Sequence, residues 1–166
     1  MGADFYMSLN SIRTRLNQKA VALQLPIGAE DKLSGVIDIL EKKAYTFSGF
    51  NGVNVEEIAI PEDMKAKVDE YHNELVEKAV ECDEKTMEKY LSGQEVSLAE
   101  LKAAIRKGVI ANAIYPVLCG TALQNIGVQL VLDAVVEYLP SPLDVPEIEA
   151  SDVSDSEKKY PVIADD

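Results

Sequence analysis

Apolar residues recur every three or four positions in several stretches of the chain, which predicts amphipathic helices. The expected helices cover residues 5–16, 64–80, 84–91, 98–109 and 128–139. Asp4 is placed to cap the first helix and Asp83 the third, because short acidic side chains accept hydrogen bonds from free helix N–H groups. Ser97 and Glu100 have the spacing of a capping box before the fourth helix.

The same spacing predicts which side of the last two helices is buried. In the fourth helix the expected buried residues are Leu98, Leu101, Ile105 and Val109, and in the fifth they are Val128, Val131, Leu132, Val135 and Leu139. Each set lies along one side of its helix, so each helix is expected to pack that side against a core.

Short apolar runs between the first two helices predict four strands, in residues 20–28, 34–40, 43–47 and 53–61. The turn-rich sequence "SGFNG" at 48–52 predicts a hairpin between the last two. No helix of ordinary length fits between these runs, so a small, mostly antiparallel sheet is the simplest arrangement.

The segment "IYPVLCGTALQNIGVQLVLDAVVEYLPSP", residues 114–142, has the pattern of a strand, a loop with glycines and a helix. Pro116 cannot donate to a strand ladder, which favours an edge strand. The loop "CGTALQNIG" is a candidate ligand site, because ligands of α/β sheets bind beyond the carboxyl ends of the strands. A plain strand-to-helix turn is the alternative.

Composition limits the function classes. The 166 residues carry a formal net charge of −13, which disfavours binding to a nucleic-acid backbone and favours a partner with a basic surface. The apolar runs are far shorter than a membrane-spanning helix, and no signal peptide is recognisable, so we expect a cytoplasmic protein. Cys82 and Cys119 are expected to be free thiols, because they lack zinc-site spacing and His72 is the single histidine.

Catalytic motifs for phosphate binding, metalloprotease chemistry and serine hydrolysis are missing from the sequence, so no catalytic residue is predicted. His72 is expected to be structural or solvated. A carboxylate stripe is predicted on the helix after Pro61 and consists of Glu70, Glu74, Glu77, Glu81 and Glu84. A solvated helix face is the general alternative for such a stripe.

Several segments, in the same order along the chain, resemble the bacterial elongation factor G family of translational GTPases. They are "GADFY", "LQLPIGAEDKLSGVIDIL", "MEKYLSGQE", "CGTALQNIGVQLVLDAVVEYLPSP" and "YPVIADD". The resemblance implies an α/β fold, in which a partial P-loop GTPase sheet holds an inserted α+β subdomain with a small mixed sheet. It also implies that the chain is a segment of a longer GTPase that uses GTP hydrolysis to drive translocation of tRNA and mRNA on the ribosome.

The resemblance divides the chain into four parts. Residues 1–16 would be the GTPase-domain helix after the guanine-specificity motif, and residues 17–112 the insert. Residues 113–140 would supply the edge strand, the fifth guanine-nucleotide motif and the last helix of the GTPase domain. Residues 141–166 are rich in Pro, Glu, Asp and Ser, and would be a linker towards the second domain.

Site residues follow from the resemblance by position. Thr121, Ala122 and Leu123 fall on the motif whose backbone N–H groups approach the guanine oxygen of GTP or GDP. A second set, Glu77, Glu81 and Glu84, falls on the insert helix that meets the C-terminal domain of the ribosomal stalk protein and promotes phosphate release. The family uses Mg²⁺ with the nucleotide, but the phosphate loop, the switches and the Asn-Lys-x-Asp motif are outside this sequence. We therefore expect no bound nucleotide and no GTP hydrolysis by the chain alone, and no direct nucleic-acid or membrane contact.

The acidic composition leaves a different class of function open. The chain can also be read as a self-contained acidic protein-interaction module that has no nucleotide role.

Overall fold

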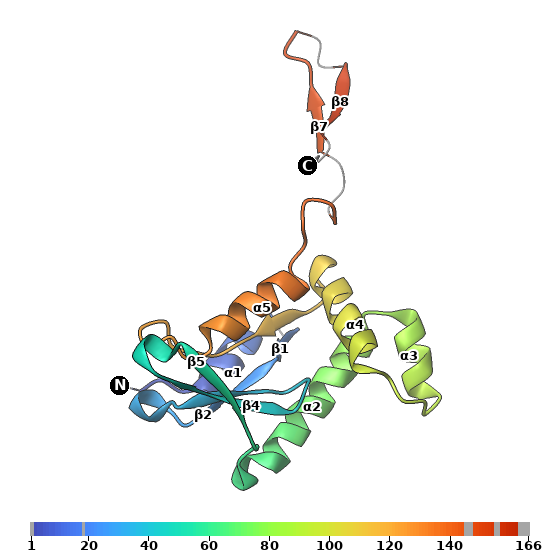
Figure 1. The fold of residues 1–166 in the computed structure, drawn as a ribbon. Helices are drawn as coiled ribbons and strands as arrows, with labels where there is room; N and C mark the ends of the chain where they lie inside the picture. The colour runs from blue at the N-terminus through green and yellow to red at the C-terminus, as the bar shows by residue number, and fades with distance from the viewer. Residues whose placement is uncertain (1, 18, 145–147, 155–156, 163–166) are drawn as a thin grey trace.

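The computed structural model has a mixed α/β fold, with helices packed around small sheets (Figure 1). It describes residues 2–17, 19–144, 148–154 and 157–162. The helices are α1 (Phe5–Arg15), α2 (Lys65–Val80), α3 (Glu84–Leu91), α4 (Leu98–Ile110) and α5 (Val128–Tyr138). The strands are β1 (Ala20–Ala22), β2 (Gln24–Ile27), β3 (Gly35–Asp38), β4 (Lys43–Ser48), β5 (Asn54–Ile58), β6 (Tyr115–Val117), β7 (Ile148–Ser151) and β8 (Lys159–Val162).

The predicted helices and three of their caps are confirmed. The Asp4 side chain accepts from the Met7 N–H before α1, and the Asp83 side chain accepts from the Thr86 N–H before α3. Ser97 and Glu100 form both bonds of the capping box before α4. Each cap satisfies N–H groups that have no partner within the helix, so the local sequence decides where these helices begin.

The first apolar run, predicted as one strand, forms two strands in two different sheets. β1 pairs in parallel with β6, whereas β2 begins an antiparallel sheet with the order β2-β3-β4-β5. Leu23 is the point of exchange, because its N–H donates to Val117 O and its carbonyl accepts from the Ile39 N–H. The antiparallel sheet and the β4–β5 hairpin were predicted, but the parallel pair was not.

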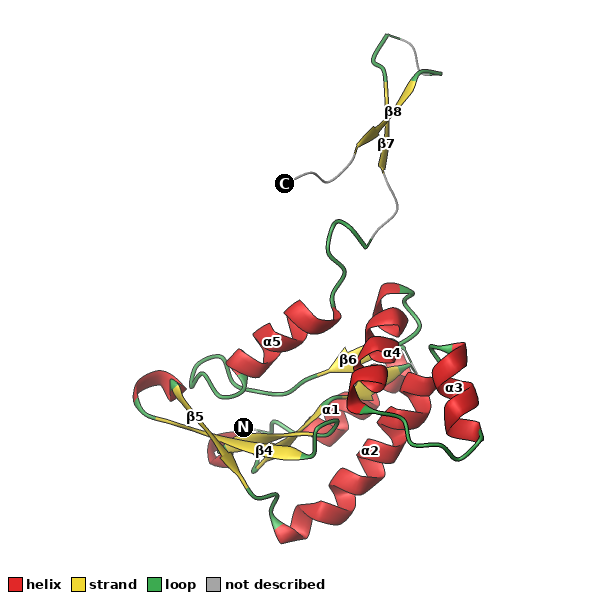
Figure 2. Ribbon diagram, turned by 45° about the vertical axis from the view of Figure 1, so that its right-hand side comes forward, coloured by secondary structure: helices red, strands yellow, loops and turns green. Residues whose placement is uncertain are grey.

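One hydrophobic core joins the two sheets and their helices. Its fully buried residues include Leu9 from α1, Val21 from β1, Leu25 from β2, Ile37 from β3, Leu75 from α2 and Ile105 from α4. Figure 2 shows α2 and α5 on opposite sides of the antiparallel sheet, with α4 between their ends. The predicted insert, residues 17–112, therefore shares its core with α1 and β6.

Two predictions of buried helix surface are partly wrong. Leu98 begins α4 and is 41% exposed, although Leu101 and Ile105 of the same stripe are buried as expected. In α5, three residues of the predicted apolar side are exposed, namely Leu132, Val135 and Leu139. Much of the apolar side of α5 therefore faces outward.

The tail contains an antiparallel β7–β8 hairpin within the segment that was predicted to be a linker. The hairpin stands apart from the other elements (Figure 1). Lys159 pairs with Glu149 across it, with 2.6 Å between Nζ and Oε2. Most of the final "YPVIADD" segment, from residue 163 onward, lies outside the described residues.

Candidate functional site

The loop after β6 is a closed turn held by its own backbone. Thr121 and Ile126 exchange two hydrogen bonds, from Thr121 N to Ile126 O at 2.9 Å and from Ile126 N to Thr121 O at 3.1 Å. Two glycines flank this bridge because the backbones nearly touch. A Cβ at Gly120 would lie 2.5 Å from Ile126 O, and one at Gly127, where φ is +80°, would lie 2.8 Å from Cys119 O.

This geometry divides the three predicted guanine-side residues into two kinds. The Thr121 N–H is already used inside the loop, whereas no other described group accepts from the N–H of Ala122 or Leu123. Both of these residues are exposed at the tip, where Leu123 is 94% exposed. The turn is closed by the Asn125 N–H, which donates to Ala122 O at 3.3 Å. Ala122 and Leu123 therefore offer two adjacent donors to a ligand.

A broad groove of about 1130 Å³ lies beside the loop. Three segments line it: the start of α1 with the residues before it, residues 26–33 at the end of β2 and beyond it, and residues 118–121. Cys119 belongs to the wall, and burial raises the pKa of its thiol to about 12, so it stays protonated near neutral pH. The sequence indicated the loop side of the groove, but not the α1 side, because nothing local predicts that contact.

The tip of the β4–β5 hairpin touches the same loop from another direction. Asn125 Nδ2 donates to Asn51 O at 2.7 Å, and Gln129 Nε2 donates to Gly52 O at 3.1 Å. We call these two bonds the hairpin contact. The sequence predicted the hairpin turn, but not its target, which lies more than 70 residues further along the chain.

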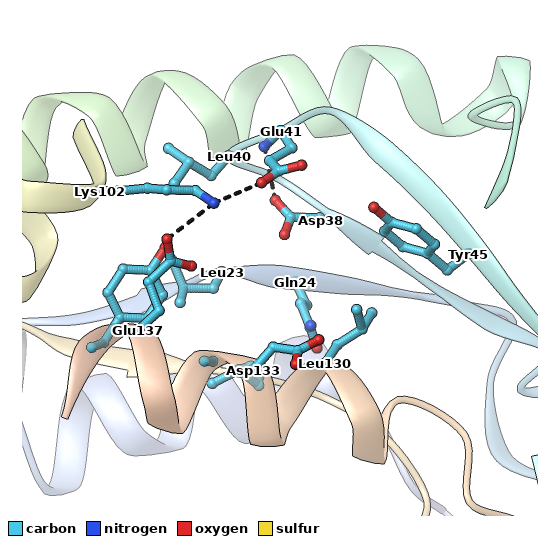
Figure 3. A pocket seen from close by; sticks show the side chains of 13 residues that line it. Leu23, Gln24, Asp38, Leu40, Glu41, Tyr45, Lys102, Leu130, Asp133 and Glu137 are labelled. Carbon is cyan, nitrogen blue, oxygen red and sulfur yellow. Dashed lines mark hydrogen bonds and ion pairs between the residues drawn. The ribbon is translucent and has the colours of Figure 1, made fainter. Parts of the chain in front are cut away.

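A smaller cavity of about 250 Å³ lies between the β3–β4 turn, α4 and α5 (Figure 3). Lys102 Nζ lies 2.7 Å from Glu41 Oε1 and 3.0 Å from Glu137 Oε1. The Lys102 hydrogen bond lowers the pKa of Glu41, whereas burial raises the pKa of Asp38 in the same cavity. The lysine is held between two carboxylates, so this network ties three elements together.

The structure separates the predicted acidic residues. Glu77 lies in α2, Glu81 caps the end of α2, and Glu84 begins α3, so the expectation of a single local helix for all three is wrong. All three are exposed, and Lys78 lies 3.4 Å from Glu81. Glu74 of the same stripe instead forms a 2.5 Å ion pair with Arg13 of α1. The stripe is therefore partly used inside the fold, and its exposed end lies at the α2–α3 junction.

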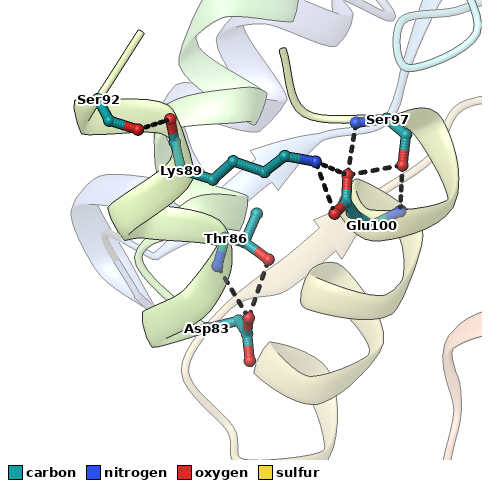
Figure 4. Close-up of polar contacts among 6 residues, drawn as sticks. All are labelled: Asp83, Thr86, Lys89, Ser92, Ser97 and Glu100. Carbon is teal, nitrogen blue, oxygen red and sulfur yellow. Dashed lines mark hydrogen bonds and ion pairs between the residues drawn. The ribbon is translucent and has the colours of Figure 1, made fainter. Parts of the chain in front are cut away.

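Polar contacts fix the orientation of that junction (Figure 4). Lys89 of α3 lies 2.9 Å from both carboxylate oxygens of Glu100, which is also part of the α4 capping box. The hydrogen bond from Lys89, together with those from Ser97, lowers the pKa of Glu100 to about 2. Lys107 of α4 similarly lies 2.8 Å from Asp83 Oδ1. The bonds hold α3 against α4.

Other candidate chemistry is sparse in the part of the chain that the structure describes. His72 Nδ1 lies 2.9 Å from Ile39 O, which gives the ring a structural bond. Cys82 and Cys119 are free cysteines, as predicted. Among the described residues, no cluster of three or more His, Cys, Asp or Glu side chains is arranged to hold a metal ion. The helices of the described residues are too short or too polar to cross a membrane.

The chain is similar to a protein of solved structure over most of its length. A crystal structure of a protein from Thermus thermophilus superposes with a TM-score of 0.78 and 32% sequence identity over 86% of this chain. The match covers 21% of the Thermus chain, so the present chain spans about a fifth of that protein. No family model matches the sequence.

Proposed function

We propose that this chain forms the guanine-side edge of a nucleotide-binding domain in a translational GTPase of the elongation factor G type. The groove beside the 118–121 loop carries the proposal. It is open, and its wall includes Thr121. The next two residues, Ala122 and Leu123, have N–H groups that donate to no described group. Pockets that recognise a flat base combine apolar walls with a few placed backbone donors.

The surfaces around α5 support a sheet that continues beyond this chain. β1 and β6 form a two-stranded parallel sheet, whereas parallel sheets are ordinarily buried on both faces. On α5, Leu132 is 60% exposed and Val136 is 83% exposed. A larger parallel sheet with its own helices would cover these surfaces, and the Thermus protein is about five times as long as the matched region.

The exchange of strand partners at Leu23 refines the proposed division. Because β1 pairs with β6, we place it with α1 and α5 in the GTPase sheet, and we begin the insert at Leu23 instead of residue 17. The insert then consists of the antiparallel sheet with α2, α3 and α4. The chain leaves the GTPase sheet after β1 to form the insert, and it returns to that sheet at β6.

Hydrolysis needs groups that this sequence does not supply. Phosphoryl transfer requires a cradle for the phosphates, a bound Mg²⁺ and a positioned water. No GxxxxGK[ST] motif is present in the chain. We therefore assign base recognition to this segment, and phosphate binding, metal binding and catalysis to the rest of the proposed GTPase.

Nucleotide binding by the intact protein tests the proposal. It should bind fluorescent GDP and discriminate against ADP. Leu123→Pro removes one donor at the second position of the Ala122–Asn125 turn, where proline is favoured, and Leu123→Ala keeps that donor. One hydrogen bond contributes about 0.5–1.5 kcal/mol, so the proline variant should bind GDP about two- to tenfold more weakly than the alanine variant. Equal affinities for GDP and ADP in the wild type would refute base recognition.

We further propose that Glu77, Glu81 and Glu84 contact a basic partner, the C-terminal domain of the ribosomal stalk protein. The exposed carboxylates and the fixed α2–α3 junction support this role. Contacts of this kind are fast, weak and sensitive to salt. The partner assignment comes from the family resemblance.

Charge reversal tests the acidic contact. Changing all three residues to Lys in the intact protein should slow phosphate release on ribosomes and leave GDP affinity unchanged. Reversal of Glu56, Glu62 and Glu95, which are also exposed, matches the change in net charge at other places. Equal effects of the two triple variants would reduce the finding to a general charge effect. Loss of partner binding in a protein that binds no GDP would favour the self-contained acidic module.

A further inference from the structure

The hairpin contact joins two parts of the chain that the proposed division assigns to different subdomains. The hairpin tip belongs to the insert, and the loop after β6 belongs to the nucleotide edge. Both bonds run from side chains of the loop and of α5 to backbone carbonyls of the tip. The contact therefore depends on the backbone position of the hairpin, and no side-chain donor or acceptor of the tip takes part in these two bonds.

Both backbones are shaped for this close approach. Gly52 is buried with φ at +60°, and a Cβ there would lie 2.9 Å from Asn125 O and 2.9 Å from Gln124 O. Asn51 and Asn125 both have φ at 55°, in the left-handed region that asparagine tolerates better than most residues. Such positions are uncommon outside glycine, and two of them face each other across one contact.

Gln129 bonds the hairpin through one atom of its amide, the nitrogen. Its Nε2 donates to Gly52 O, while its Oε1 is buried with no hydrogen-bond partner among the described residues. A buried acceptor without a partner is unfavourable. The amide orientation that leaves Oε1 unpaired is the one that lets Nε2 bind the hairpin.

We propose that the hairpin contact positions the loop that carries Ala122 and Leu123, and so couples the inserted sheet to nucleotide release. This inference rests on the proposed function. Asn125 lies two residues from Leu123, and its own N–H closes the turn on Ala122 O. Displacement of the hairpin would loosen that turn. Since coupling is reciprocal, a partner that moves the insert changes nucleotide affinity, and the nucleotide changes affinity for that partner by the same factor.

The chain offers a closely matched pair of variants. Asn125→Asp keeps the size and the tolerance for a left-handed backbone, but removes the donor to Asn51 O. Asn112→Asp is the control, because Asn112 has φ at 54°, is exposed in the turn after α4, and makes no side-chain hydrogen bond within the described structure. Both variants add one negative charge. Asn125→Asp should melt slightly below Asn112→Asp, because it alone loses a hydrogen bond.

Hydrogen exchange tests the contact in the chain itself, without nucleotide. The N–H groups of Thr121, Asn125 and Ile126 should exchange about five- to tenfold faster in Asn125→Asp than in wild type, and at the wild-type rate in Asn112→Asp. Equal exchange in the two variants would show that the hairpin does not hold the loop, and would overturn the inference.

GDP dissociation from the intact protein tests the coupling. Asn125→Asp should release fluorescent GDP about five- to tenfold faster than Asn112→Asp. Faster exchange with unchanged GDP release would overturn the coupling. If the wild-type protein binds no GDP, the proposed function and the coupling both fail, whereas the exchange measurement still decides whether the hairpin holds the loop.

Discussion

Arg106 is expected to contribute substantially to the stability of the fold, because it joins α4 to the end of α5. Its Nη1 donates to Glu137 O at 2.8 Å and to Leu139 O at 3.1 Å, and its Nη2 lies 2.6 Å from Asp144 Oδ2. The two carbonyls end α5, where a positive charge also interacts favourably with the helix dipole. Arg106→Ala removes all of these interactions at once.

The magnitude follows from the kinds of bond that are lost. Each hydrogen bond to a carbonyl is worth about 0.5–1.5 kcal/mol. The ion pair with Asp144 is partly exposed, at 31% and 30% for the two side chains, so it adds at most about 1 kcal/mol. The expected loss is therefore about 2 kcal/mol. For a chain of this size, this corresponds to a fall in melting temperature of about 4–8 °C.

Urea unfolding followed by circular dichroism measures the loss as a change in the free energy of unfolding. Arg15→Ala is the matched control, since Arg15 is exposed in α1 and no described group bonds to it. Its expected effect is within about 0.5 kcal/mol. Arg106→Lys keeps the charge but lacks the planar guanidinium group, so its free energy of unfolding should lie between those of Arg106→Ala and wild type. Equal losses in Arg106→Ala and Arg15→Ala would refute the reasoning.

Three further outcomes are expected. The hydrogen bond from Lys107, together with those from Thr86, lowers the pKa of Asp83 from 3.8 to about 2. The contribution of the Asp83 carboxylate to stability is therefore present above pH 4 and is lost as the pH falls towards 2. The stability difference between wild type and Asp83→Asn, measured by urea unfolding, should narrow over that window. Ile105→Ala, at a fully buried site, should cost about 2–5 kcal/mol in the same assay. Changing both Leu132 and Val136 to Asp should leave the stability of this chain nearly unchanged and lower the melting temperature of the intact protein.

Local signals predicted the helices well, because a cap depends on residues three or four positions apart. Asp83 and the Ser97–Glu100 pair acted as their sequence indicated, and so did the turn at 48–52. Leu23 could not be predicted in this way. Its two backbone bonds reach β6 and the end of β3, and a continuous apolar run carries no mark of where a strand changes its partner.

The candidate site was likewise predictable only in its local features. The glycines at 120 and 127 made the loop recognisable, since a tight backbone approach requires residues without a side chain. Its occupied and free N–H groups could not be told apart, because Thr121 bonds within the loop by a bridge that no short motif encodes. The hairpin contact was missed for a similar reason. Its donors and its carbonyls are distant in sequence, and backbone carbonyls have no residue identity to recognise.

The exposed side of α5 helps to choose between the two functions that the sequence left open. A self-contained module that binds its partner through acidic residues does not account for Leu132 and Val136, because exposed apolar residues of this kind mark an apolar contact surface. A segment of a larger sheet would require them, since parallel sheets carry helices on both faces. The net charge of −13 fits either reading, but the uncovered side of α5 fits the second. The apolar spacing that predicted burial of this helix is therefore explained if its covering partner belongs to the rest of a longer protein.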